Sequence, residues 1–70
     1  MTQCERVLKY MDDFGSISTA QAFLDIGVAR LASRIHDLRR RGVQIASETV
    51  YTQNRYGEPT HYSVYKRAVG

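Results

Sequence analysis

One stretch constrains the fold of this chain more than any other, the segment from Val28 to Gly42 (VARLASRIHDLRRRG). Apolar residues recur along it at the spacing of one helix face: Val28, Leu31, Ile35 and Leu38. At about 3.6 residues per turn, polar residues share the opposite side: Arg30, Ser33, Arg34, Asp37 and Arg41. The pattern predicts a helix over residues 28–41, ended by Gly42 as a left-handed C-cap residue. We expect one face of this helix to be buried and the other to be presented to a partner.

The distribution of charge indicates what that partner is. The net charge is +3, and five of the ten Lys and Arg residues lie between Arg30 and Arg41. The first 28 residues hold two bases against four acids. Such clustering creates a local positive field that favours polyanions. An ordinary solvated helix face is the alternative.

Length and cysteine content limit the class of protein. Seventy residues predict one small domain, residues 1–70, and an apolar fraction of 43% is ordinary for a globular protein. The single cysteine, Cys4, excludes an internal disulfide and any multi-cysteine metal cluster. The sequence has no apolar run near the roughly 20 residues that span a bilayer, and no signal-peptide core. We therefore expect a cytoplasmic protein with no membrane partner.

A first helix is predicted over residues 3–14. Thr2 and Glu5 have the spacing of a capping box, and Gly15 ends the helix. Its apolar stripe comprises Cys4, Val7, Leu8, Met11 and Phe14. Cys4 is on this stripe, so we expect a small buried hydrophobe rather than a reactive thiol.

A second, two-turn helix is predicted over residues 19–25. Ser18 is a good N-cap with Gln21 at the third position, and Ile17 can pack as a hydrophobic staple. The expected inner residues are Ala20, Phe23 and Leu24. A short turn containing Gly27 joins this helix to the helix at 28–41, which is helix-turn-helix spacing.

After Gly42 the pattern changes to that of strands, predicted over residues 43–52 and 60–66 with a loop between them. The phase of the apolar residues slips between Ile45 and Val50, which indicates either a bulge or a strand leaving the core. Tyr62 and Val64 are expected to point inward. Three helices followed by a hairpin give an α+β winged helix order.

Two segments carry a resemblance to a known family: Ser18 to Gln21, and Ile35-x-x-Leu38-Arg39-x-x-Gly42-Val43. The chain resembles the winged helix-turn-helix DNA-binding domains of short bacterial and phage proteins, and is similar to the N-terminal domain of the biotin repressor. The resemblance spans about residues 3–66 and implies a three-helix core, a β-hairpin wing and DNA binding through the third helix. It implies that bases face Arg30, Ser33 and Arg34, and that the wing tip holds Arg55 and Tyr56. The biotin repressor carries a ligand-binding domain after its winged helix, and we expect none here.

The residue chemistry on the third helix suits DNA. Arginine pairs bidentately with guanine O6 and N7, and Arg30 and Arg34 are one turn apart. Ser33 can bond to an adjacent base or phosphate. Asp37 can accept from cytosine N4, but we favour a helical ion pair with Arg34 or Arg41.

Other positions are predicted to contact phosphate. Arg40 and Arg41 end the helix, whereas Arg39 points to the core edge and is expected to be structural. The N-terminus of the second helix and the wing tip add further candidates. In full, the predicted DNA-binding residues are Arg30, Ser33, Arg34, Asp37, Arg40, Arg41, Thr19, Gln21, Asn54, Arg55 and Tyr56.

Catalytic and metal chemistry are not indicated. His36 and His61 are far apart in the sequence and lack carboxylate or cysteine at ligand spacing. The hairpin tyrosines could stack on single-stranded bases, but cross-strand packing explains most of them. We expect no enzyme activity and no cofactor.

The sequence therefore predicts a sequence-specific double-stranded DNA-binding protein of bacterial or phage type, acting as a transcriptional regulator or an excisionase-like architectural factor. The alternative is a protein-binding winged helix that inhibits or adapts a host protein complex. Self-association, as a dimer or a cooperative array, and a host or phage protein partner stay open.

Overall fold

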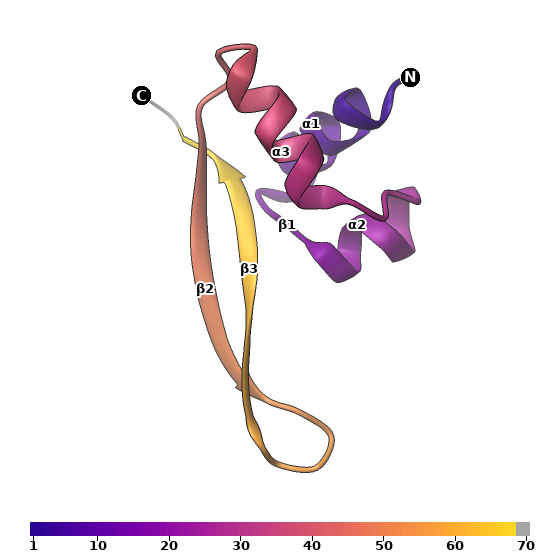
Figure 1. Cartoon of the computed structure of the whole chain (residues 1–70). Coiled ribbons are helices and arrows are strands. Elements are labelled where there is room, and N and C mark those ends of the chain that lie inside the picture. The colour runs from indigo at the N-terminus through magenta and orange to yellow at the C-terminus, as the bar shows by residue number, and fades with distance from the viewer. Residues whose placement is uncertain (69–70) are drawn as a thin grey trace.

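The structure is a computed structural model that describes residues 1–68. These residues form three helices and three strands in the order α1 (Gln3–Phe14), β1 (Ile17–Ser18), α2 (Thr19–Ile26), α3 (Leu31–Arg40), β2 (Ile45–Gln53) and β3 (Pro59–Arg67). The helices gather at one end, and the hairpin of β2 and β3 extends away from them (Figure 1). We call this hairpin, with its connecting loop at residues 54–58, the wing. The predicted α+β winged helix order is confirmed.

Both predicted capping boxes are present. The Glu5 amide donates to Thr2 Oγ1 and the Thr2 amide donates to Glu5 Oε1, each at 3.1 Å. At α2, the Gln21 amide donates to Ser18 Oγ at 3.2 Å, and the Ser18 amide donates to Gln21 Oε1 at 2.9 Å. These bonds satisfy amides that a helix start leaves without partners. The hydrogen bonds to Thr2 also hold the pKa of Glu5 below its ordinary value.

The predicted start of α3 at residue 28 is wrong, because the helix begins at Leu31. Gly27 adopts a left-handed conformation, with a φ of 69°. The Val28 amide donates to the Ala22 carbonyl at 2.8 Å, so Val28 belongs to the turn that follows α2. Val28 is nevertheless fully buried with the helix residues, which is why its spacing imitates an extra turn.

The end of α3 follows the prediction at Gly42. Arg41 is the C-cap in a right-handed conformation, and Gly42 follows it with a φ of 94°. The Gly42 amide donates to the Arg39 carbonyl at 3.0 Å, and the Val43 amide donates to the Leu38 carbonyl at 3.1 Å. This pair of bonds is the Schellman motif, which glycine favours because it has no Cβ.

The sheet has the antiparallel order β1-β3-β2. The register of β2 on β3 runs without interruption from Ile45↔Arg67 to Gln53↔Pro59. The slip in apolar phase is therefore not a bulge in this pair, and the strand instead leaves the core. Ile45 is buried, whereas the strand is mostly exposed beyond Ala46.

The strand β1 was not predicted. It has only two residues, Ile17 and Ser18, which pair with Tyr65 and Val64 of β3. Two residues are too few to show the alternation that identifies a strand in a sequence. Ser18 consequently ends β1 and caps α2, while Ile17 is fully buried.

The core contains the apolar faces of α1 and α3, closed by β1 and the start of β2. Its buried residues are Cys4, Val7, Tyr10, Met11, Ile17, Ala22, Val28, Leu31, Ile35, Leu38 and Ile45. Cys4 is buried as predicted.

Several residues that were predicted to be buried are exposed. Phe14 is 71% exposed, Phe23 61% and Leu24 77%. Ala22 is the only fully buried residue of α2, and Ala20 is exposed. This helix contacts the core through Ala22 and the half-buried Ile26, which leaves Ala20, Phe23 and Leu24 uncovered.

Candidate nucleic-acid interface

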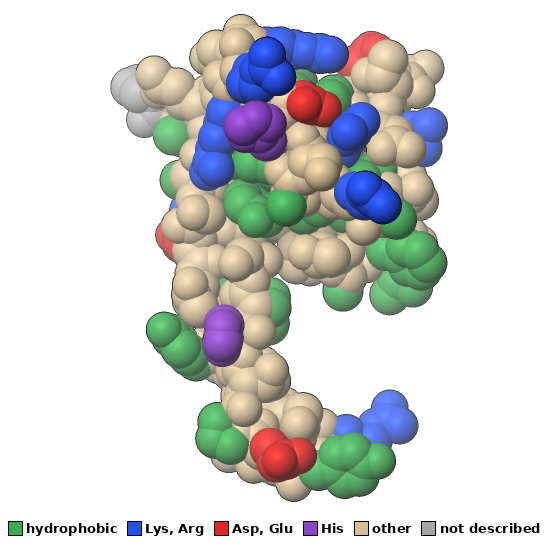
Figure 2. All heavy atoms as spheres, viewed as in Figure 1, with side chains coloured by type: hydrophobic (Ala, Val, Ile, Leu, Met, Phe, Trp, Pro, Cys, Tyr) green, Lys and Arg blue, Asp and Glu red, His purple; other side chains and the backbone are tan. Residues whose placement is uncertain are grey.

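The packing of α3 determines which of its side chains face outward. Leu31, Ile35 and Leu38 are each about 1% exposed and face the core. The other side of the helix therefore faces solvent, and Figure 2 shows Lys and Arg side chains gathered over this region of the molecule. Arg30 is the N-cap residue rather than an internal helix residue, and its side chain makes no capping bond. It lies exposed at the beginning of this face, as Ser33 does within it.

Arg34 and Asp37 form the ion pair that the sequence favoured. Arg34 Nη2 lies 3.3 Å from Asp37 Oδ2, and both residues are half-buried. Arg34 Nε is buried and, within the described residues, has no hydrogen-bond partner. The carboxylate limits the orientations of the guanidinium, which presents planar donors suited to a base edge or a phosphate.

Arg39 has a structural role, as predicted. Its Nε and Nη2 donate to the Ile45 carbonyl at 3.3 and 2.8 Å. The side chain thereby ties the end of α3 to the start of β2. Arg40 and Arg41 are instead exposed and line one hollow with Asp37. Their charges lie near the negative end of the helix dipole.

Asn54 organises the tip of the wing. Its Oδ1 accepts hydrogen bonds from the Tyr56 amide at 2.9 Å and the Glu58 amide at 3.0 Å. Gly57 completes the turn with a φ of 77°, and its amide donates to the Asn54 carbonyl at 3.0 Å. The Asn54 side chain is thus used within the loop, whereas Arg55 and Tyr56 are exposed at its end.

The N-terminus of α2 forms a third part of the candidate surface. Thr19 and Gln21 are both exposed there. The oxygen of the Gln21 side chain is occupied by the capping box, so its role in this structure is to begin the helix. Thr19 lines a small hollow with Ser18, Ala20 and Tyr62.

The predicted inward orientation of Tyr62 is wrong. This residue was expected to point inward with Val64, but it is 47% exposed, whereas Val64 is half-buried beside β1. Alternation along β3 correctly groups the two residues on one face. Alternation cannot show that the strand has already left the core at residue 62. Tyr62 therefore lies next to the N-terminus of α2 instead of in the core.

The remaining candidates form no further site. Tyr51 and His61 face each other across the wing with ring centroids 6.0 Å apart, which agrees with cross-strand packing. His36 is exposed on α3. Over residues 1–68, no group of three or more His, Cys, Asp or Glu residues is placed to hold a metal ion.

The predicted residues therefore lie in three places: the outer face of α3, the N-terminus of α2 and the tip of the wing. The structure separates the tip from the helices, because the wing extends well beyond the core and bends at its end (Figure 1). The described part of the chain measures 39 × 26 × 20 Å. The surface can thus contact an extended ligand at points that are far apart.

Comparisons with known proteins agree with this geometry. A family model described as a winged helix-turn-helix domain matches residues 2–67. Neither the curated proteins nor the solved structures gave a match. No helix among the described residues has the length and apolar character needed to cross a membrane. A domain of the matched type suggests DNA as the partner, and because the match spans nearly all of the sequence, the chain belongs to the winged helix-turn-helix family.

Proposed function

We propose that this protein is a sequence-specific double-stranded DNA-binding protein of bacterial or phage type. The observation that carries the proposal is the exposed, arginine-bearing face of α3, opposite a fully buried apolar face. A helix fits the major groove of B-DNA, where base edges present a distinct pattern of donors and acceptors. The protein acts on DNA by occupying or bending it, as a transcriptional regulator or an excisionase-like architectural factor.

Within this proposal the arginines of α3 divide by role. Arg30 and Arg34 contact base edges, with Ser33 bonding to a neighbouring base or phosphate. Asp37 orients Arg34 through their 3.3 Å ion pair. Arg40 and Arg41 contact phosphates at the end of the helix, which fixes position along the duplex without reading sequence.

The wing and α2 supply contacts beside the groove. The Asn54-centred loop presents Arg55 and Tyr56 to a phosphate strand or a minor groove. Thr19 and Gln21 approach the backbone at the positive end of the α2 dipole. A single small module buries about 600–1,000 Å² of its own surface on DNA, so tight binding requires neighbouring copies or a larger assembly.

Salt-dependent binding tests the proposal. Affinity for a labelled duplex should fall steeply with salt. The logarithm of the binding constant, plotted against the logarithm of the salt concentration, should have a slope near −0.9 for each phosphate neutralised. A double Arg30→Ala/Arg34→Ala variant should bind a preferred sequence at least tenfold more weakly than a Lys66→Ala/Arg67→Ala control, which removes the same charge. If the two double variants weaken DNA binding equally, α3 contributes only nonspecific electrostatic attraction. Unchanged binding by the α3 double would remove the recognition-helix assignment.

One observation favours a second candidate function, a protein-binding winged helix that inhibits or adapts a host complex. Phe23 and Leu24 are exposed side by side in the sequence of α2, and exposed apolar patches mark interaction surfaces. Duplex affinity that is flat with salt, together with a protein partner retained after nuclease digestion of a lysate, would favour this candidate over DNA binding.

A further inference from the structure

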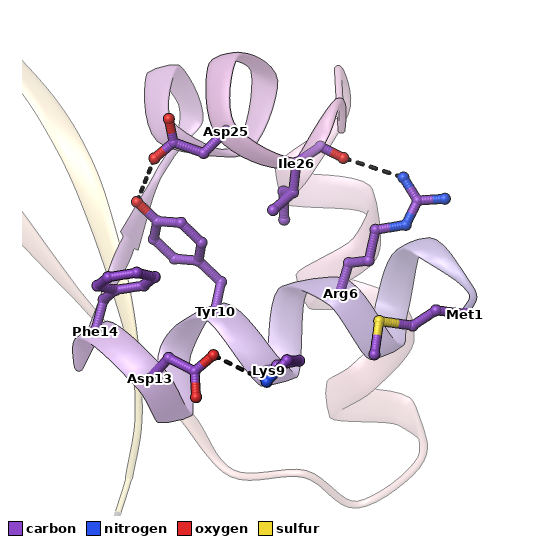
Figure 3. A pocket seen from close by; sticks show the side chains of 8 residues that line it. All are labelled: Met1, Arg6, Lys9, Tyr10, Asp13, Phe14, Asp25 and Ile26. Atoms are coloured by element: carbon purple, nitrogen blue, oxygen red, sulfur yellow. Dashed lines mark hydrogen bonds and ion pairs between the residues drawn. The ribbon is translucent and has the colours of Figure 1, made fainter.

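A groove between α1 and α2 lies outside the proposed DNA interface. It has a volume of about 400 Å³, and its lining residues come from α1, the end of α2 and Met1 (Figure 3). No lining residue belongs to α3 or to the wing. A ligand in this groove would therefore leave the outer face of α3 accessible.

Two hydrogen bonds join the walls of this groove. Tyr10 Oη donates to Asp25 Oδ2 at 2.5 Å, which joins α1 to the end of α2. Arg6 Nη1 donates to the Ile26 carbonyl at 3.1 Å, which holds the turn that follows α2. Figure 3 shows both bonds bridging the two helices, with the Ile26 side chain between Tyr10 and Arg6. These two bonds fix the end of α2 to α1.

Met1 and Phe14 line the groove and are both largely exposed, and Phe14 is the one that belongs to α1. It is 71% exposed, and its ring contacts Tyr10 at a centroid distance of 4.6 Å. The apolar spacing of α1 suits Phe14 to burial, yet the packing of α1 on the core does not cover this side chain. Because Phe14 itself lines the groove, it forms part of a contiguous surface with the other lining residues, and exposed contiguous apolar surface indicates an interaction site.

The charges along this side of α1 are self-complementary. Arg6 and Lys9 lie toward its N-terminus, and Asp13 lies toward its C-terminus. Lys9 Nζ and Asp13 Oδ2 are 3.1 Å apart in an exposed pair, which contributes little stability by itself. If a second α1 packs antiparallel about a twofold axis at the level of Met11, Lys9 of each copy faces Asp13 of the other. The same placement puts Phe14 between Tyr10 and Arg6 of the second copy.

We propose that the α1–α2 groove binds a second copy of this chain, forming a twofold dimer with antiparallel α1 helices. The Phe14 side chain of each copy enters the groove of the other. At about 1.5 Å per residue, a 12-residue helix is about 18 Å long. A contact about one short helix long is at the small end of protein–protein interfaces, where weak and transient complexes lie, so we expect a weak dimer. The twofold also relates two α3 helices, so DNA sites would be inverted repeats, a consequence that rests on the proposed function.

Sedimentation velocity without DNA tests the dimer, so its failure is distinct from a failure of DNA binding. The full chain should shift from monomer to dimer as its concentration rises from micromolar to millimolar. Phe14→Ser should weaken the dimer at least tenfold. Phe23→Ser is the matched control, since Phe23 is 61% exposed but does not line the groove. It should leave the dimer unchanged. Circular dichroism checks that both variants stay folded.

Charge exchange tests the antiparallel arrangement. Lys9→Glu alone and Asp13→Lys alone should each weaken the dimer, because each puts like charges opposite one another. The double variant Lys9→Glu/Asp13→Lys should restore it. A chain that stays monomeric up to millimolar concentration overturns the proposal. So does a dimer lost in Phe23→Ser but kept in Phe14→Ser, or a double variant no better than the single ones.

Discussion

The tip of the wing offers a test of whether loop geometry, rather than charge alone, contributes to DNA binding. Asn54→Ala removes the acceptor for the Tyr56 and Glu58 amides, at 2.9 and 3.0 Å. A typical hydrogen bond contributes about 0.5–1.5 kcal/mol, and these two are exposed, so about 1–2 kcal/mol of loop order should be lost. The same two bonds are absent from the unfolded chain, so the free energy of unfolding should fall by no more than about 1–2 kcal/mol while the core, which is far from the loop, stays folded.

The cost should appear in DNA affinity. A loss of about 1–2 kcal/mol corresponds to binding that is about 5–30-fold weaker. Because Arg55 is still present in Asn54→Ala, the dependence of affinity on salt should keep its slope. Arg55→Ala removes a phosphate contact instead, and the magnitude of its slope should fall by about 0.9.

Fluorescence anisotropy with a labelled duplex at several salt concentrations measures both quantities, and urea unfolding checks the fold. A role of the Asn54 bonds in DNA binding is refuted if Asn54→Ala binds DNA as well as the unmodified protein while Arg55→Ala binds weakly. In that case the loop does not need its Asn54 bonds to position Arg55. If neither variant affects binding, the wing tip does not contact DNA.

Three further predictions concern the fold that carries the interface. Arg39→Met keeps an apolar stem but removes the bonds to the Ile45 carbonyl, so urea unfolding should show a loss of about 1.5–3 kcal/mol. Its DNA-binding salt slope should not change, and a reduced slope would make Arg39 a phosphate contact. Gly42→Ala should lower the free energy of unfolding by about 1–2 kcal/mol in the same assay, because a φ of 94° is unfavourable for a residue with a Cβ. The new Cβ would meet nothing within 4 Å, so the cost comes from the backbone alone. An unchanged or higher stability would contradict this. The hydrogen bond to Asp25 raises the pKa of Tyr10 above its ordinary value of 10.0. The contribution of this bond to the stability of the fold is therefore present below pH 10 and is lost as the pH rises through the raised pKa. Urea midpoints on either side of pH 10 should therefore fall more for the unmodified protein than for Tyr10→Phe, and parallel declines would exclude the linkage.

Local interactions account for what could be predicted from the sequence. Each capping box joins residues three positions apart, and the Schellman turn at Gly42 involves only the last turn of α3 and the residues after it. The inner face of α3 follows from helical spacing, and so does its pairing of Arg34 with Asp37, three residues apart. These features depend on neighbours along the chain, so residue order is sufficient to identify them.

The candidate interface was predictable in part for the same reason. Sequence order indicated that Arg39 differs from the other arginines of α3, and its bonds to Ile45 confirm this. The wing loop was recognisable from its composition. Sequence order could not show that Asn54 holds that loop together. Whether its Oδ1 accepts from amides of its own loop or from an external donor depends on how the turn closes.

Contacts between distant segments decided the rest. Val28 belongs to a turn rather than to α3 because it bonds back to Ala22, and β1 exists only because β3 lies beside it. Phe14, Phe23 and Tyr62 are exposed although the sequence pattern suited them to burial. Periodicity shows which residues share a face of a helix or strand. Only the tertiary structure decides whether another element covers that face, because covering depends on where distant segments lie in space.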